Sequence, residues 1–187
     1  MTRFTFHTTA TAPAAAQPIL EQVTEKYGFT PNLMAGLANA PATLEAYVAL
    51  TTLMERTSFS QIERQVIVLT ASVANGCSYC VAGHSASAVR QGIPNDVIDA
   101  IRSGTAIRDP RLQALHLFTV KMIEQQGWIS QADGTAFLDA GFEAHQVLEV
   151  ILGLAMKTIS NYANQVMDTP LDAVFAGQVW HGQAAAD

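Results

Sequence analysis

The sequence predicts an all-helical protein, a single domain of about seven to nine helices. Apolar residues recur at helical spacing through most of the chain, as in the run with Ile62, Val66 and Leu69. No segment alternates apolar and polar residues over the length of a strand, and hairpin turns flanked by β-branched residues are missing. Helix-capping and helix-stopping residues divide the chain at short intervals. Together these observations place the chain in the all-α class.

The first sixteen residues are small and are expected to form a loosely ordered lead-in to the domain of residues 17–187. Prolines at helix starts, serines at N-caps and glycines past helix ends fix the expected helices. The expected helices of the first half span residues 18–27, 32–38, 41–56, 61–74 and 77–91. Those of the second half span residues 95–103, 110–127, 131–140 and 143–164, with a short last piece after Pro170.

The bulk composition excludes several classes of partner. The net charge is −6 and no basic stripe is present, so nucleic acid is not expected to bind. No apolar run reaches the roughly 18 residues of a membrane helix, and the N-terminus has no apolar core of a secretory signal. We therefore expect a cytoplasmic protein, whose thiols are kept reduced. Charged residues are only 14% of the chain. This low share favours burial of some surface in a homo-oligomer.

The two cysteines of the chain, Cys77 and Cys80, are three residues apart, and His84 follows four residues later. If a helix begins at Cys77, these side chains share one face, because residues three and four apart are neighbours on a helix. A helix N-terminus favours an anion, and an imidazole accepts a proton. The pattern therefore indicates a thiol that ionises, attacks, and is resolved by its neighbour.

Three other interpretations of the cysteines remain open. A structural zinc site needs four ligands, and no second Cys or His pair stands at ligand spacing to His84. A structural disulfide would close a very small loop and gain little from chain entropy. The third interpretation treats both cysteines as inert core residues. We favour the redox pair and expect neither a metal nor an organic cofactor, since nucleotide-binding glycine motifs are missing.

The segment 75–84, with Asn-Gly before C-x-x-C and a histidine after it, resembles the core of the alkyl hydroperoxidase D-like proteins. These belong to the carboxymuconolactone decarboxylase superfamily, and the resemblance is best over residues 60–92. It implies an all-helical fold, homo-oligomers (trimers, hexamers or dimers), and reduction of hydrogen peroxide or alkyl hydroperoxides. It also implies that Cys80 attacks, Cys77 resolves and His84 relays protons. A lipoyl-bearing or thioredoxin-like partner would supply the electrons.

The sequence departs from this family at the position of the relay glutamate, which here is Gln65. An amide forms hydrogen bonds but accepts no proton in this range. The nearby Glu63 fits a capping box and lies on nearly the opposite helix face. The relay is expected to be cut short, to run through water, or to use another carboxylate such as Glu149. We therefore hypothesise slower peroxide turnover than in a full-relay member.

Tyr79 stands between the cysteines, where some relatives carry a histidine. A phenol is a poor base at neutral pH but a good hydrogen-bond donor, so Tyr79 is expected to donate a hydrogen bond or to pack at a subunit contact.

Two further functions stay open besides the peroxidase or disulfide reductase. One is the lactone decarboxylase chemistry of the wider superfamily, against which the presence of both cysteines argues. The other is a helical redox sensor or binding module with little turnover, which Gln65 makes more plausible.

Overall fold

The computed structural model describes residues 4–182 and confirms the all-α prediction. Within those residues the secondary structure is helical throughout, without a strand. The α-helices are α1 (Gln17–Tyr27), α2 (Asn32–Leu37), α3 (Pro41–Glu55), α4 (Gln61–Ala74), α5 (Ser78–Arg90), α6 (Asn95–Ser103), α7 (Pro110–Glu124), α8 (Gln131–Asp139) and α9 (Ala144–Met167). Two 3-10 helices, η1 (Thr9–Thr11) and η2 (Ala173–Gln178), lie near the ends of the described chain.

The helix boundaries follow local capping chemistry, and two of them differ by more than one residue from the expected ranges. Helix α7 ends at Glu124, three residues before the expected glycine, because the backbone leaves the helix at Gln126, where φ is 51°. Helix α9 continues past Asn164 to Met167. Asn164, where the helix was expected to end, is buried in the structure, and the helix runs on through it.

The N-terminal lead-in contributes to the packing in its described part, residues 4–16. Thr9–Thr11 form η1, and Ala12 and Ala16 are buried. The N–H of His7 donates to the carbonyl of Ala35 in α2 at 3.1 Å. Small side chains there allow this segment to lie close to α1 and α2.

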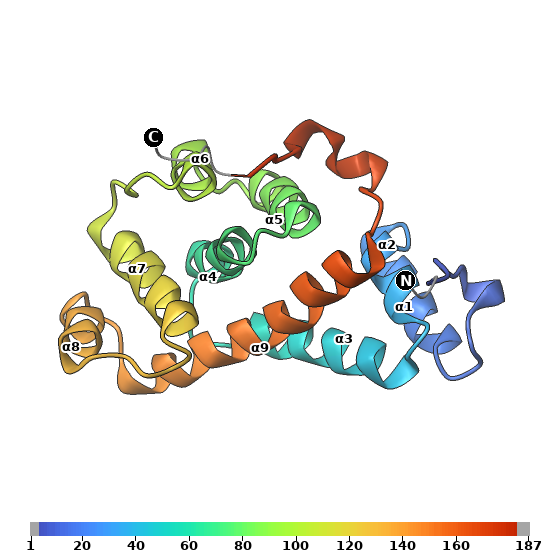
Figure 1. Ribbon diagram of the computed structural model, residues 1–187, viewed down its shortest axis with the longest axis horizontal. Coiled ribbons are helices and arrows are strands. Elements are labelled where there is room, and N and C mark those ends of the chain that lie inside the picture. Colours follow the sequence, from blue (N-terminus) through green and yellow to red (C-terminus); the bar gives the residue numbers. More distant parts are fainter. Residues whose placement is uncertain (1–3, 183–187) are drawn as a thin grey trace.

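Helix α4 lies at the centre of the molecule, in contact with α5, α6, α7 and α9 (Figure 1). Long α9 crosses beside α3 and α4, while α7 and α8 lie at one end and α1 and α2 at the other (Figure 1). Gly153 permits the close approach of α9 to α4, because a Cβ there would meet Ile67 Cγ2 at 2.8 Å. The chain after α9 returns over α5 through η2. Helices α4, α5 and α9 therefore enclose the middle of the core.

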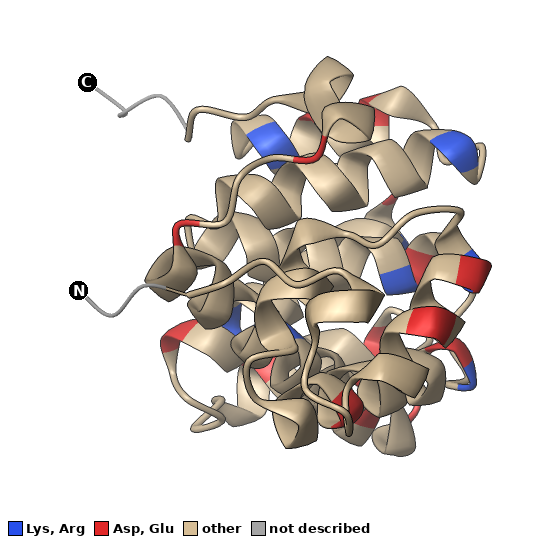
Figure 2. Ribbon diagram, turned by 90° about the vertical axis from the view of Figure 1, so that its right-hand side faces the viewer, with Lys and Arg blue, Asp and Glu red and all other residues tan. Residues whose placement is uncertain are grey.

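Charged residues are sparse on the ribbon and form no basic stripe in the view of Figure 2. Among residues 4–182, no helix is both long enough and apolar enough to cross a membrane.

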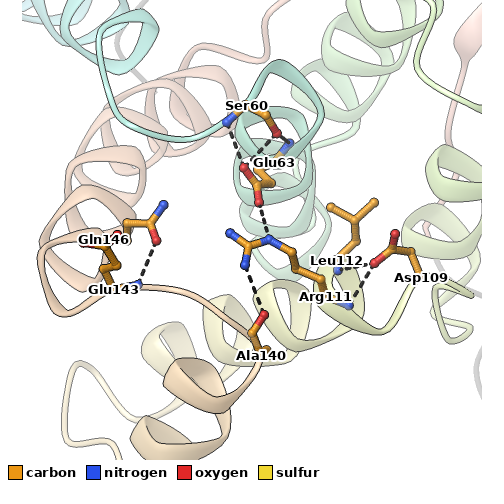
Figure 3. A network of polar contacts seen from close by, with 8 residues as sticks. All are labelled: Ser60, Glu63, Asp109, Arg111, Leu112, Ala140, Glu143 and Gln146. Carbon is orange, nitrogen blue, oxygen red and sulfur yellow. Dashed lines mark hydrogen bonds and ion pairs between the residues drawn. The ribbon is translucent and has the colours of Figure 1, made fainter.

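The start of α4 is held by a polar network that joins α4, α7 and α8 (Figure 3). Ser60 is the N-cap of α4: its Oγ accepts from the Glu63 N–H, and the Glu63 carboxylate accepts from the Ser60 N–H at 2.8 Å. Arg111 Nε donates to Glu63 Oε1 at 2.9 Å, and its Nη1 donates to the carbonyl of Ala140 at 3.1 Å. Glu63 therefore has the structural role in the capping box that the sequence indicated.

Candidate active site

The two cysteines lie at the turn from α4 into α5. Gly76 has a φ of 63°, and this left-handed conformation reverses the chain so that Cys77 becomes the N-cap of α5. The Cys77 Sγ accepts a hydrogen bond from the Cys80 N–H at 3.4 Å. Both side chains are nearly fully buried, with 2% of Cys77 and 4% of Cys80 exposed. The local sequence thus brings both sulfurs to one end of α5.

Helix α9 supplies polar side chains to the sulfurs that sequence reasoning missed. Asn164 Nδ2 donates to Cys80 Sγ at 3.1 Å and lies 3.9 Å from Cys77 Sγ. Asn161 accepts a hydrogen bond from Asn75 Nδ2 at 2.9 Å. Both asparagines are buried. Buried polar residues spaced three and four apart, at Lys157, Asn161 and Asn164, were the signal that could have found them.

His84 is bound by a lysine rather than by a sulfur. Lys157 Nζ lies 2.8 Å from His84 Nε2, and only 1% of Lys157 is exposed. An ammonium group only donates, so Nε2 accepts and the imidazole carries its proton on Nδ1. Within residues 4–182, every ion pair involves other groups, and no carboxylate pairs with Lys157.

The two sulfurs differ in acidity. Burial disfavours the Cys80 thiolate, but the hydrogen bond from the Cys77 thiol and the charge of Lys157 favour it more strongly. With the amides of Asn164 and Asn161 added, the pKa of Cys80 falls to about 5. The pKa of Cys77 is raised, first by its hydrogen bond to Cys80 and then by burial. At neutral pH the pair therefore consists of a Cys80 thiolate and a Cys77 thiol.

His84 is a neutral imidazole at the same pH. Burial, followed by the charge of Lys157, lowers its pKa well below the ordinary histidine range. It can therefore accept a hydrogen bond from Lys157 without adding a second buried cation.

Tyr79 points from α5 to the returning chain. Its hydroxyl donates to the carboxylate of Asp172 and accepts from the Leu33 N–H at 3.2 Å. Asp172 also accepts from the Asn32 N–H at 3.2 Å. Burial and then the bond to Asp172 raise the pKa of Tyr79, so this phenol stays protonated. Tyr79 holds the segment between the cysteines against α2 and the chain before η2.

A cavity of about 150 Å³ adjoins Cys80, with His84 and Lys157 in its wall. The rest of its lining is largely apolar and aromatic: Tyr27, Phe29, Pro31, Leu33, Met34, Tyr47, Tyr79, Met156 and Phe175. A neighbouring pocket of about 380 Å³ shares His84 and Arg90 with it and is lined by more charged and amide groups. Of the two, only the smaller cavity has a cysteine, Cys80, in its lining.

The two residues considered for the proton relay, Gln65 and Glu149, lie in different parts of the molecule. Gln65 lines the larger pocket together with His84, but its Nε2 donates to Gln91 Oε1 at 3.1 Å and its buried Oε1 has no partner. Glu149 accepts from the N–H and the hydroxyl of Ser58, at 3.0 and 2.6 Å, and lines neither pocket. The suggestion that Glu149 replaces the relay glutamate was wrong, because it lies two helical turns from Lys157 and is bonded elsewhere.

Solved structures show the same fold. The chain aligns with the alkylhydroperoxidase AhpD core of an uncharacterized peroxidase-related protein from Ralstonia eutropha JMP134 at a TM-score of 0.81 and 24% identity, covering 96% of this chain and 97% of that one. An uncharacterized peroxidase-related protein from Silicibacter sp. TM1040 aligns at 0.77 and 22%, covering 89% of both chains. The debrominase Bmp8, in a Cys-to-Ala variant bound to 2,3,4-tribromopyrrole, aligns at 0.78 and 19%, covering 95% and 96%. The helices thus form an AhpD-like fold.

The amino-acid sequence also matches a known family over part of its length. Residues 41–119 match the profile of the carboxymuconolactone decarboxylase family, and this stretch contains the C-x-x-C pair and His84. This part of the chain is therefore similar to the carboxymuconolactone decarboxylase family, and the fold of the whole is AhpD-like, as the motif indicated. No curated protein sequence matches it.

Proposed function

We propose that the protein is a thiol-dependent peroxidase or disulfide reductase in which Cys80 attacks and Cys77 resolves. The observation that carries the proposal is the unequal treatment of the two sulfurs. Cys80 receives a hydrogen bond from Asn164 and lines the cavity together with Lys157, whereas the pKa of Cys77 is raised and Cys77 caps the helix. Only a thiolate attacks a peroxide or disulfide efficiently, so the asymmetry assigns the roles.

The proposed reaction has two steps. The Cys80 thiolate attacks the terminal oxygen of a hydroperoxide, so that an S–O bond forms, the O–O bond breaks, and sulfur loses the two electrons that the peroxide gains. The resulting sulfenic acid condenses with the Cys77 thiol, which forms the disulfide and releases water. A dithiol reductant, lipoyl-bearing or thioredoxin-like, then returns two electrons by exchange.

The cavity favours an organic hydroperoxide over hydrogen peroxide. Its aromatic and aliphatic walls would bury an apolar substituent, and about 25 cal/mol of transfer free energy per Å² would accompany that burial. Hydrogen peroxide offers no such substituent. We propose that KM is lower for an aryl or alkyl hydroperoxide than for hydrogen peroxide.

We also propose a homo-oligomer formed through α9. Its outer face carries exposed apolar side chains at helical spacing: Leu148, Ile151, Tyr162 and Val166. The opposite face of the same helix holds Lys157 and Asn164 in the site.

The test combines thiol titration with turnover. We expect iodoacetamide to modify Cys80 of the native reduced protein at a rate that rises with pH about a midpoint near 5, while Cys77 stays slow. Replacing Cys80→Ser should abolish peroxide consumption with a dithiol reductant. The matched control is Ser78→Ala, an exposed neighbour at the first position of α5, which should retain activity.

Two results would contradict the proposal. One is a pair of thiols that native alkylation leaves untouched at every pH. The other is negligible turnover with a change of oligomer size on oxidation, seen by size-exclusion chromatography with and without reductant, which would support a redox sensor instead.

A further inference from the structure

Lys157 is a buried cation without a carboxylate partner among the described residues. The other two lysines of the chain, Lys26 and Lys121, are exposed and pair with Glu55 at 2.7 Å and Glu124 at 3.1 Å. Lys157 is 1% exposed and has only the neutral nitrogen of His84 at hydrogen-bond distance. Burying a lone ammonium group costs several kcal/mol unless an opposite charge lies nearby. A negative charge within the site would offset that cost.

Among the ionisable groups of the cavity wall, only one can supply the negative charge opposite Lys157. The cavity wall that includes Lys157 holds Tyr79, Cys80, His84 and Arg90 from α5, Tyr47 from α3 and Tyr27 from α1, and Cys77 lies beside Cys80. Burial keeps the tyrosines protonated, and Cys77 and His84 are neutral. Among the groups that line the cavity, only Cys80 offers a negative charge; the Asp172 carboxylate accepts from the Tyr79 hydroxyl and is not part of the cavity wall. Lys157 and the Cys80 thiolate are thus counter-ions across the α5–α9 contact.

We propose that Lys157 is the acid of the peroxide-reducing step, donating its proton to the oxygen that leaves when Cys80 attacks. This inference rests on the proposed function. Attack forms the S–O bond of a Cys80 sulfenic acid and breaks the O–O bond, and the departing alkoxide takes a proton from the Lys157 ammonium. The products are an alcohol, a neutral sulfenic acid and a neutral amine, so atoms, electrons and charge balance.

Charge burial explains why a lysine suits this role. The thiolate and the ammonium vanish together in the step, so the closed site is neutral before and after it. The amine that remains still donates a hydrogen bond to His84 Nε2, which keeps the side chain in place. When a dithiol later reduces the disulfide, one of its protons restores the ammonium and the Cys80 thiolate re-forms. Lys157 therefore supplies the proton that a relay glutamate at the position of Gln65 would otherwise transfer.

The experiment counts protons during reduction of the oxidised protein by dithiothreitol at about pH 7, where the reagent is protonated. Ultraviolet absorbance of the thiolate is followed in the same sample. In the unaltered protein, Cys77 and Lys157 take up both protons of the reagent. We expect a thiolate to appear with no net proton release.

Variants of Lys157 separate its charge from its proton. Lys157→Arg keeps a cation that cannot give up a proton, so we expect a thiolate, about one proton released per disulfide, and turnover reduced at least about 100-fold. Lys157→Met removes the cation, so we expect no thiolate at this pH and a rise of the alkylation midpoint toward the ordinary cysteine range. Lys121→Met is the matched control and should behave like the unaltered protein.

His84 is the other group that could take up the second proton when the disulfide is reduced. The His84→Asn variant tests this alternative. Retention of zero net release in this variant supports Lys157, whereas release of about one proton assigns the store to the imidazole and overturns the inference. Release of about one proton by the unaltered protein overturns it as well, even if turnover is normal. A thiolate with zero release but no turnover of any hydroperoxide or disulfide overturns the proposed function instead and leaves the Lys157 proton store standing.

Discussion

The N-termini of α4 and α5 have the same local hydrogen-bonding pattern but different roles. Ser60 caps α4 and accepts from the N–H of Glu63 three residues on, and Cys77 caps α5 and accepts from the N–H of Cys80 three residues on. Both of these hydrogen bonds measure 3.4 Å. In each case the third helical residue carries an acidic side chain that turns back toward the cap.

The difference lies in what meets the acidic group. The Glu63 carboxylate receives the Ser60 N–H and the guanidinium of Arg111, a strong and partly exposed set of donors that leaves it no free role. The Cys80 sulfur receives an amide hydrogen of Asn164 beside a cavity, with the charge of Lys157 nearby. The first arrangement stabilises a helix end. The second keeps an anion available, which is what a nucleophile requires.

Of the three replacements, Cys77→Ser should reduce turnover the most, because it removes the resolving thiol. It should leave the stability nearly unchanged, because serine can take over the N-cap. Serine is a favoured N-cap residue, so we expect the unfolding free energy to change by less than about 0.5 kcal/mol. A hydroxyl cannot condense with a sulfenic acid. Steady-state turnover should therefore fall at least about 100-fold, which equals about 2.7 kcal/mol in activation free energy. Multiple rapid turnovers with a dithiol reductant would refute the resolving role of Cys77.

Replacing Glu63→Gln breaks the other cap and should have an intermediate effect. The change removes the charge that Arg111 contacts, and because Arg111 is partly exposed we expect a loss of about 1–2 kcal/mol in urea unfolding, with turnover unchanged. The hydrogen bonds of Ser60 and the pairing with Arg111 outweigh burial and lower the pKa of Glu63.

The sign of the pH dependence follows from that lowered pKa. A carboxylate whose pKa is lower in the folded protein stabilises it above the ordinary glutamate range, and the contribution is lost as the pH falls through the folded pKa. The stability gap between the unaltered protein and Glu63→Gln should therefore narrow as the pH falls below the ordinary glutamate range. A gap that stays constant down to the lowest pH at which both proteins fold would show that packing, not charge, accounts for the loss.

Replacing Gln65→Glu should have the smallest effect. This change places a carboxylate in the pocket that His84 also lines. If Lys157 already supplies the proton, turnover should change by less than about threefold. A gain of tenfold or more, with the Lys157 variants still active, would instead support the missing-carboxylate explanation of slow turnover.

Local patterns predicted the parts of the molecule that depend on neighbouring residues. Ser60, Pro41, Pro110 and Gly104 mark helix ends in the sequence, and the structure has helices α4, α3, α7 and α6 bounded there. The juxtaposition of Cys77 and Cys80 is likewise a matter of three residues on one helix start.

The partners of the thiolate could not be predicted in this way. Lys157 reaches His84 across 73 residues of chain, and Asn164 reaches Cys80 across 84. Only the packing of α9 against α5 brings them together, and no local pattern specifies that contact. The helix was expected to end near Asn164, whereas the structure continues it and places the Asn164 Nδ2 on Cys80 Sγ.

The bond between Tyr79 and Asp172 joins two parts of the chain that are synthesised at different times. Asp172 also accepts the N–H of Asn32, a residue synthesised 140 positions earlier. On the ribosome, the cysteines therefore emerge well before Lys157, Asn164 and Asp172 exist. Until those residues arrive, a nascent chain carries two ordinary thiols, and the acidity of Cys80 is acquired only when the later helix docks.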